Sequence, residues 1–235
     1  MQISAVPKEI NEWSGSVLIA GILEGTIESQ INFFKAIIKD TFLSQRFIDS
    51  KFEGKKNQKL SIELIEGKVK KVIFVGLGKA ETLQIDDLRK AASIGTRQVS
   101  GYERKLGIFF PWDAFDTSSA ACAVGEAVRL SSIKDFRFKS EPKEPTPIDK
   151  VELIGLDTKT TKSAIDEINP ICEGVKFARE LVSSPPNFLT PYQLAKEAEK
   201  LAHDYDLDLK ILDKKECEKQ GMGAYLAVAK GSDLE

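Results

Sequence analysis

The stretch ARELVSSPPNFLTP, residues 178–191, divides this 235-residue sequence into two parts. The helical pattern of KFARELV ends at the SSPP run, because proline lacks an N–H and its ring clashes with the carbonyl one turn back. The residue before each proline is also disfavoured in the α region. Thr190 then has the position of an N-cap, with Pro191 at the first helical position and Gln193 placed to complete a capping box. We therefore expect one helix to end before this stretch and another to begin at its end.

Composition and charge narrow the classes of protein and partner. Apolar residues make up 42% of the chain and charged residues 30%, a balance typical of a globular protein. The formal net charge of −2 gives no reason to expect nucleic acid or an anionic membrane as a partner. The apolar runs SVLIAGIL and VIFVGLG are far shorter than the ~20 residues of a membrane span. The first residues, MQISAVPKEI, resemble neither a secretory signal nor a transit peptide, so we expect a cytoplasmic protein.

Strand and helix patterns alternate in the first part of the chain. Short apolar or alternating runs predict strands; these are residues 2–6, 16–20, 59–65, 69–75, 105–110 and 151–155. Apolar residues three or four apart predict helices; these are residues 28–42, 86–99 and 118–130. The short connection between the third and fourth strands favours a hairpin or antiparallel neighbours. The order of elements predicts an α/β sandwich with a mixed sheet.

The next segments lead to the division and beyond it. Residues 137–149 hold three prolines and several charges, which is typical of a solvated loop. Residues 159–182 form a long helical pattern with one apolar stripe, and Pro170 should bend this helix or divide it in two. A further helix is expected over residues 190–205.

The last part of the sequence carries short local signals. Residues 207–212 have a strand-like pattern. The DKKE sequence at 213–216 is a second capping box, and the GMG sequence at 221–223 is expected to end the short helix that the box begins.

The sequence GLG at 76–78 follows an apolar strand and invites comparison with dinucleotide-binding turns. The third glycine of that fingerprint would fall at position 81, where Glu81 would repel a pyrophosphate. A phosphate-binding GK[ST] sequence is also missing from the chain. We therefore interpret the GLG sequence as a strand-to-loop turn.

Histidine and cysteine offer little for catalysis. His203 is the only histidine, and it lies in a predicted helix rich in lysine and glutamate, so we expect it at the surface or at the boundary of the core. No G-x-S-x-G nucleophile elbow occurs. Cys122, Cys172 and Cys217 are odd in number and widely spaced, which fits neither a disulfide framework nor a zinc site. Cys122 and Cys172 lie beside small or apolar residues in predicted helices, so we expect buried thiols.

Neighbouring carboxylates fall on polar helix faces or beside turns; they are Asp86 with Asp87, Glu197 with Glu199, and Asp204 with Asp206 and Asp208. The last trio resembles a calcium loop, but the expected glycine is missing and Lys215 stands where such a loop has its glutamate. Side-chain chemistry alone therefore predicts no site competent for catalysis or metal binding.

ARELVSSPPNFLTP, with LAKEAEKLA and ILDKKECEKQGMGAYLAVAKGSD after it, resembles the junction region of the leucyl aminopeptidase (cytosol aminopeptidase) family. The resemblance extends back through RFKSEPKEP and VELIGLD to VIFVGLGK and is densest over residues 172–233. Members of this family are two-domain metalloexopeptidases that release N-terminal amino acids from peptides. The resemblance implies a macro-domain-like sandwich at residues 1–157, a connecting helix at 158–184 and the incomplete start of a catalytic α/β domain at 185–235.

The resemblance also implies the family's cofactors and assembly. Two divalent metal ions, manganese or zinc in the full-length family, bind a bridging water and the substrate's free amine. The family motif N-T-D-A-E-G-R-L and the glycine-rich segment with the metal-binding lysine are missing here, and we expect both beyond Glu235. No residue of this chain is therefore assigned a catalytic, cofactor-binding or metal-binding role, and no bound metal is expected. Peptide substrates and the family's homohexamer both depend mainly on the missing domain.

Two interpretations follow from these expectations. We favour the N-terminal part of such an enzyme, cut short by truncation or by an incomplete gene record and inactive by itself. The alternative is a stand-alone, non-catalytic binding or assembly module, for example an ADP-ribose-binding macro-type domain. That alternative needs a glycine-rich loop around the phosphates, beyond the single GLG sequence.

Overall fold

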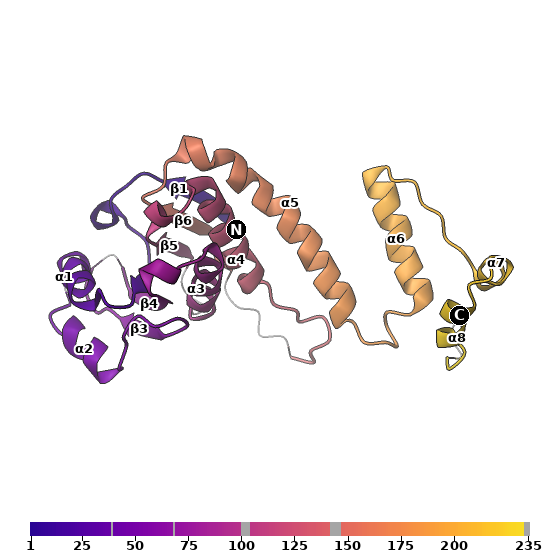
Figure 1. Ribbon diagram of the computed structural model, residues 1–235, viewed down its shortest axis with the longest axis horizontal. Coiled ribbons are helices and arrows are strands. Elements are labelled where there is room, and N and C mark those ends of the chain that lie inside the picture. Colours follow the sequence, from indigo (N-terminus) through magenta and orange to yellow (C-terminus); the bar gives the residue numbers. More distant parts are fainter. Residues whose placement is uncertain (39, 68, 100–103, 142–146, 233–235) are drawn as a thin grey trace. The chain divides into compact units, whose positions relative to one another are not determined.

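The computed structural model describes residues 1–38, 40–67, 69–99, 104–141 and 147–232 (Figure 1). It divides into two compact units, Met1–Lys176 and Phe177–Glu235. We call the first the sheet unit and the second the helical unit. The division falls inside one helix, α5 (Thr158–Ser183), which continues from the first unit into the second.

A six-stranded mixed sheet forms the centre of the sheet unit, in the order β1-β6-β5-β2-β4-β3. Its strands are β1 (Gln2–Val6), β2 (Val17–Leu23), β3 (Lys59–Glu63), β4 (Lys71–Gly78), β5 (Lys105–Phe109) and β6 (Lys150–Ile154). Neighbouring strands are parallel except β3 and β4, which pair antiparallel from Lys59 opposite Val75 to Glu63 opposite Lys71. The predicted strands, the antiparallel neighbours and the mixed α/β class are confirmed, while the likeness to a macro-type domain stays a prediction.

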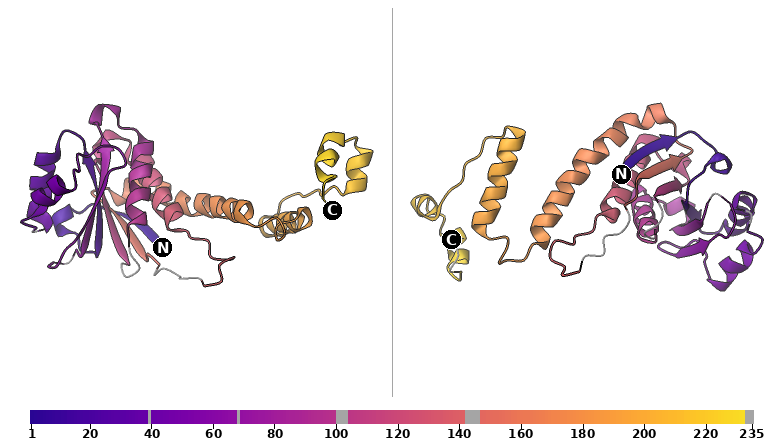
Figure 2. Two further views of the ribbon diagram at one scale, coloured as in Figure 1. Left: turned by 90° about the horizontal axis from the view of Figure 1, so that it is seen from below. Right: turned by 180° about the vertical axis from the view of Figure 1, so that it is seen from behind.

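Helices cover both faces of this sheet, as the left view of Figure 2 shows. The helices are α1 (Ile27–Ile38) and α2 (Leu43–Asp49) on one face, and α3 (Ile85–Arg97) and α4 (Thr117–Ser132) on the other. β4 is buried along its whole length. Ile73 and Val75 pack in the core with α3 and α4, while Val72 and Phe74 pack in the core with α1 and α2. The continuous apolar run of β4 is explained by this burial on both faces.

The first predicted helix is wrong at its C-terminal end. Residues 28–42 were expected to form one helix, but α1 ends at Ile38 and α2 begins at Leu43. Phe42, the expected last member of the buried stripe, is 69% exposed. The Asp40 carboxylate accepts a hydrogen bond from the Phe42 amide at 2.8 Å, a local turn that competes with helix continuation.

α5 is one helix of 26 residues that contains Pro170. Of the two outcomes expected for Pro170, division of the helix does not occur. Ile168 and Cys172, two residues before and after the proline, are fully buried within the sheet unit. Their burial holds the helix in place although Pro170 has no backbone N–H to donate. Beyond the sheet unit the apolar stripe is exposed, and Val182 is 87% exposed. The helix ends at Ser183, before the two prolines, as predicted.

The described part of the helical unit contains helices but no strand. After α5 come α6 (Pro191–Tyr205), α7 (Lys214–Lys219) and α8 (Gly223–Ala229). The strand predicted at residues 207–212 is wrong, and Leu207, Leu209 and Ile211 are exposed there. A strand needs a neighbouring strand to pair its backbone N–H and C=O groups, and the described residues of this unit offer none.

Helix caps in the helical unit follow the sequence closely. Thr190 caps α6 by accepting from the Gln193 amide at 3.2 Å, but the Gln193 side chain donates to Glu197, so this predicted capping box is only half formed. The Asp213 box is complete, with hydrogen bonds to Glu216 in both directions at 2.8 and 3.1 Å. The GMG sequence ends α7 as predicted, because Gly221 follows the C-cap with a φ of +69° and the Met222 amide donates to the Cys217 carbonyl at 3.1 Å. Gly223 then begins α8.

Two further sequence expectations concern the loop at residues 137–149 and membrane-spanning helices. The loop predicted at 137–149 forms no helix or strand in its described residues, and residues 142–146 lie outside them. No helix in the described stretches has the length and apolarity needed to cross a bilayer.

Candidate functional site

The GLG turn that ends β4 is filled by neighbouring backbone. A Cβ atom on Gly76 would lie 2.0 Å from the carbonyl oxygen of Lys55, and Gly78 has a φ of +81°. The amides of both glycines are used, since Gly76 donates to the Gln58 carbonyl and Gly78 to the Gly54 carbonyl, each at 2.8 Å. These glycines therefore serve close backbone packing, and the geometry does not favour a phosphate-binding loop or an ADP-ribose module.

Asp87 is buried, accepts a hydrogen bond from the Gln84 amide at the start of α3 and pairs with Lys56 Nζ at 2.7 Å, which is a structural role. Other polar candidates from the sequence lie apart on exposed surfaces. Glu81 is exposed in a short 3-10 turn after β4. His203 is 89% exposed, with its Nδ1 atom 3.3 Å from Asp204 Oδ1. Asp206 caps the C-terminus of α6 in the left-handed conformation, with φ of 52°. Across the described ranges, no three His, Cys, Asp or Glu side chains gather to hold a metal ion. The described residues thus do not fit a two-metal centre.

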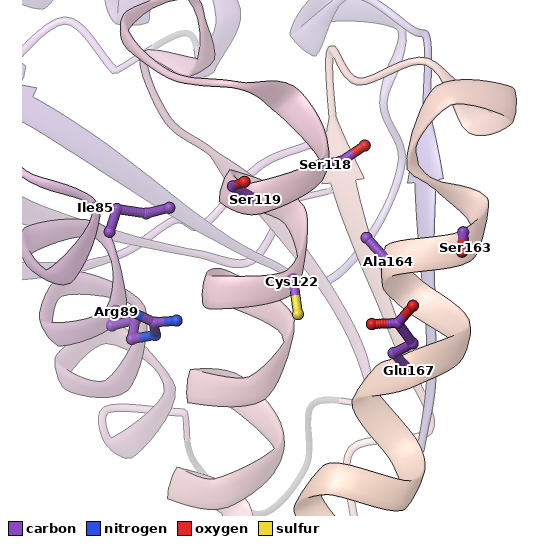
Figure 3. Close-up of a pocket in the computed structure, with 8 residues that line it drawn as sticks. All are labelled: Ile85, Arg89, Ser118, Ser119, Cys122, Ser163, Ala164 and Glu167. Carbon is purple, nitrogen blue, oxygen red and sulfur yellow. The ribbon is translucent and has the colours of Figure 1, made fainter.

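A groove in the sheet unit lies between α3, α4 and α5 and has a volume of about 540 Å³. Figure 3 shows it with its lining side chains, which come from all three helices. They are Ile85, Arg89, Ser118, Ser119, Cys122, Ser163, Ala164 and Glu167. Sequence reasoning missed this groove, because its residues come from three helices whose packing the periodicity does not specify.

Arg89 carries the positive charge of the groove. Its Nη1 atom lies 2.7 Å from Asp86 Oδ1, and its Nη2 atom lies 3.5 Å from Glu126 Oε2. The hydrogen bond to Asp86 is the main cause that raises the pKa of Arg89. The guanidinium therefore stays charged and still has N–H donors beyond these two contacts.

Cys122 differs from the expected buried thiol. It is half-buried and lines the groove, with Sγ 3.5 Å from Glu126 Oε1. Burial, followed by the negative charge of Glu126, raises the pKa of the Cys122 thiol to about 11. A thiol that stays protonated at neutral pH is a poor nucleophile. Cys172 is buried as predicted, and Cys217 is buried as well.

A buried carboxylate in the sheet unit was also missed. Glu152 on β6 accepts a hydrogen bond from Trp13 Nε1 at 2.8 Å and pairs with the Nζ atoms of Lys105 at 3.0 Å and Lys150 at 2.7 Å. Burial alone would raise the pKa of Glu152, but these three donors together lower it below the usual value. The cluster fastens the turn between β1 and β2 to the sheet, so its role is structural. The sequence signal for this cluster is Glu152 itself, the one charged residue inside the apolar run VELIG.

Two family models match the chain. The model of the cytosol aminopeptidase family, N-terminal domain, matches residues 21–142, and the model of the catalytic domain of the same family matches residues 176–235. A probable cytosol aminopeptidase of Prochlorococcus marinus (strain MIT 9211) is 48% identical over 234 residues, which are 100% of this chain and 47% of that protein. A probable cytosol aminopeptidase of Synechococcus sp. (strain CC9311) is 37% identical over 238 residues, with the same coverage. The chain thus spans about half the length of the curated relatives it matches.

Solved structures give a consistent picture of the fold. A mutant of tomato leucine aminopeptidase matches with a TM-score of 0.84 and 26% identity, covering 97% of this chain and 48% of that one. The bottromycin maturation enzyme BotP in complex with Mn matches with a TM-score of 0.69 and 23% identity, covering 94% of this chain and 43% of that one. The second match concerns the fold alone.

Proposed function

The chain belongs to the cytosol aminopeptidase family, and from this membership we propose that it is the N-terminal part of a leucyl aminopeptidase-like metalloexopeptidase. The parent protein would release N-terminal amino acids from peptides in the cytoplasm. The observation that carries the proposal is the 48% identity of the whole chain to a probable cytosol aminopeptidase. Agreement with the tomato leucine aminopeptidase fold across 97% of the chain supports it.

Metal ions in such an enzyme polarise the substrate and lower the pKa of a bound water. The described residues bring no three potential ligands together, so we derive no catalytic step from this chain. We propose that two divalent ions, manganese or zinc, bind the half of the parent that this chain does not span. BotP in complex with Mn supports metal dependence in a protein of related fold. On this proposal the chain alone is inactive.

The contribution of this chain to the parent is then a scaffold. The sheet unit has a core of its own, and α5 continues from it without interruption into the segment matched by the catalytic-domain model. We propose that peptide substrates and hexamer contacts belong mainly to the remaining half. A net charge of −2 supports the expectation of neither nucleic acid nor membrane as a partner.

A chimaera tests the proposal. Residues 1–235 would replace the aligned region of the Prochlorococcus marinus relative, whose remaining half is kept. We expect the chimaera to hydrolyse leucyl p-nitroanilide with added manganese, and the chain alone to release no more product than a metal-only blank. The unmodified relative is the positive control.

Turnover by the chain alone would contradict the proposed inactivity. A chimaera that folds and assembles like the relative but does not hydrolyse the substrate would contradict the proposed scaffold role. That second result would favour a stand-alone binding or assembly module.

A further inference from the structure

The groove between α3, α4 and α5 has the size of a small-molecule site. Its volume of about 540 Å³ falls within the roughly 300–1,000 Å³ of ligand pockets. All of its lining residues belong to the sheet unit, which has its own core, so the groove is complete without the helical unit. The inference drawn from it does not rest on the proposed function.

Opposite charges stand on the two outer helices of the groove. Arg89 on α3 and Glu167 on α5 both point into the space beside α4, as Figure 3 shows. Arg89 is 42% exposed at its side chain and keeps donors that its contacts with Asp86 and Glu126 do not use. Glu167 is exposed, and no ion pair joins it to another residue within the described ranges.

Neutral polar groups line the groove between these charges. Ser118 donates its hydroxyl to the Thr160 carbonyl at 2.8 Å, and Ser119 donates to Asp116 at 2.8 Å, which leaves both hydroxyl oxygens as acceptors. Cys122 lies on α4 between the two charged side chains, and its thiol is neutral. A ligand of the groove therefore meets opposite charges at its ends and uncharged hydrogen-bonding groups in its middle.

The separation of the helices sets the length of such a ligand. α4 lies between α3 and α5, and packed helices are about 8–10 Å apart from axis to axis. An ammonium and a carboxylate on one α-carbon are too close together to reach both outer helices. An extended peptide spans about 3.3–3.6 Å per residue, so two or three residues bring its two ends to both walls.

We propose that this groove binds short zwitterionic peptides, with the terminal ammonium at Glu167 and the terminal carboxylate at Arg89. The peptide backbone between them faces the serine hydroxyls and Cys122. Two carboxylates, those of Asp86 and Glu126, already contact the Arg89 guanidinium, whereas Glu167 has no such partner among the described residues. The ammonium end therefore contributes more to binding than the carboxylate end.

The test is a titration of the intact 235-residue chain with trialanine, followed by amide NMR with EDTA present. Mass spectrometry confirms that the peptide stays uncleaved. We expect saturable shifts around the groove with a Kd of about 1 mM. N-acetyl-trialanine, which lacks the ammonium, should bind about tenfold more weakly, and trialanine amide, which lacks the carboxylate, about threefold more weakly. Free alanine cannot reach both walls and should give no saturable shifts.

Two exposed positions on α5 provide a matched pair of variants. Glu167→Gln should weaken trialanine binding about tenfold, with no further loss for the N-acetyl peptide, which already lacks the ammonium. Asp166→Asn removes the same charge at the adjacent residue, which does not line the groove, and should leave binding unchanged. Unaltered spectra away from the groove confirm that both variants fold.

The proposal is overturned if trialanine gives no saturable shifts. Equal binding of trialanine and its N-acetyl form would also overturn it, as would equal losses from Glu167→Gln and Asp166→Asn. None of these results depends on hydrolysis, so they are distinct from a failure of the proposed aminopeptidase function.

Discussion

The sheet unit and the helical unit are built with the same kinds of local signals, but only one of them has a core. In the sheet unit, apolar side chains of six strands and the covering helices form two buried clusters. In the described part of the helical unit, Cys217 alone is buried. Large apolar side chains are exposed there instead; they are Val182, Phe188, Tyr192, Leu194, Leu201, Tyr205, Leu207, Leu209, Ile211, Tyr225 and Val228.

The difference shows what local signals can and cannot do. Caps and helical periodicity are present in α6 and α7, and both helices form. A stable domain also needs apolar faces buried against other elements, because short helices gain most of their stability from packing. The catalytic-domain model matches only residues 176–235 of this chain, while the relatives are about twice as long. The exposed faces are thus consistent with a catalytic domain present in part.

The largest expected effect separates the two units directly. Phe34 is 2% exposed on α1 and packs edge-on against Phe74, with ring centroids 5.1 Å apart. Phe34→Ala should lower the free energy of unfolding by about 3–5 kcal/mol. Tyr225→Ala, at an exposed aromatic of the helical unit, should change it by less than about 0.5 kcal/mol. Urea unfolding followed by circular dichroism measures both, and similar losses would mean that the helical unit shares the core.

The next prediction uses two glycines of the sheet unit. Gly76→Ala places a methyl group 2.0 Å from the Lys55 carbonyl oxygen, and it should cost about 3 kcal/mol, the upper end for overpacking. On α5, the added Cβ of Gly174→Ala meets nothing within 4 Å. This variant should raise the free energy of unfolding by about 0.5–1 kcal/mol, because alanine favours the helix more than glycine does. Urea midpoints of the two variants should therefore move in opposite directions. An unchanged urea midpoint in Gly76→Ala would contradict the close packing of the loop over β4.

Acid sensitivity should depend on Glu152 of the sheet unit. Its lowered folded pKa means that its stabilising contribution is complete above the unfolded value of about 4.3 and is lost as the pH falls through the folded pKa. Glu152→Gln should cost about 2 kcal/mol at pH 7 and flatten the acid limb of the stability profile. Glu199→Gln removes an exposed pair with Lys196 in the helical unit and should leave the profile unchanged. An unaltered acid limb in Glu152→Gln would contradict the assigned cluster.

The smallest effect is local to the helical unit. Asp213→Ala removes the oxygen that accepts from the Glu216 amide at 2.8 Å. Loss of an N-cap costs about 1 kcal/mol, so exchange of that amide should be about fivefold faster while the main unfolding transition does not move. Asp213→Asn keeps a capping oxygen and serves as the control. A shift of the main transition in Asp213→Ala would indicate one cooperative unit.

The sequence predicts features that depend on neighbours along the chain or on simple burial. The apolar run of β4 is correct because both faces are covered, and the Asp213 box is correct because its partner is three residues away. The predicted end of the first helix is wrong because Phe42 fits the helical period, while the turn at Asp40 stops the helix before that residue. The strand at 207–212 fails because pairing depends on a distant neighbour.

The polar sites show the same limit more strongly. Trp13 and Glu152 are 139 residues apart, so no spacing in the sequence joins them. The groove depends on Arg89, Cys122 and Glu167, which the packing of three helices brings to one place. Cys122 looked like a core residue because its neighbours in the sequence are small, yet it lies at the helix face that lines the groove.

Native-state hydrogen exchange on the intact chain tests the contrast between the two units most directly. Amides of β2, β4 and β5 should exchange only through global opening of the sheet unit, whereas those of α6, α7 and α8 should exchange through local opening with free energies near zero. A difference of about 3 kcal/mol or more between the two sets, more than a hundredfold in protection, is the predicted result. Equal protection in α6 and β4 would contradict a finished scaffold joined to a partial catalytic domain.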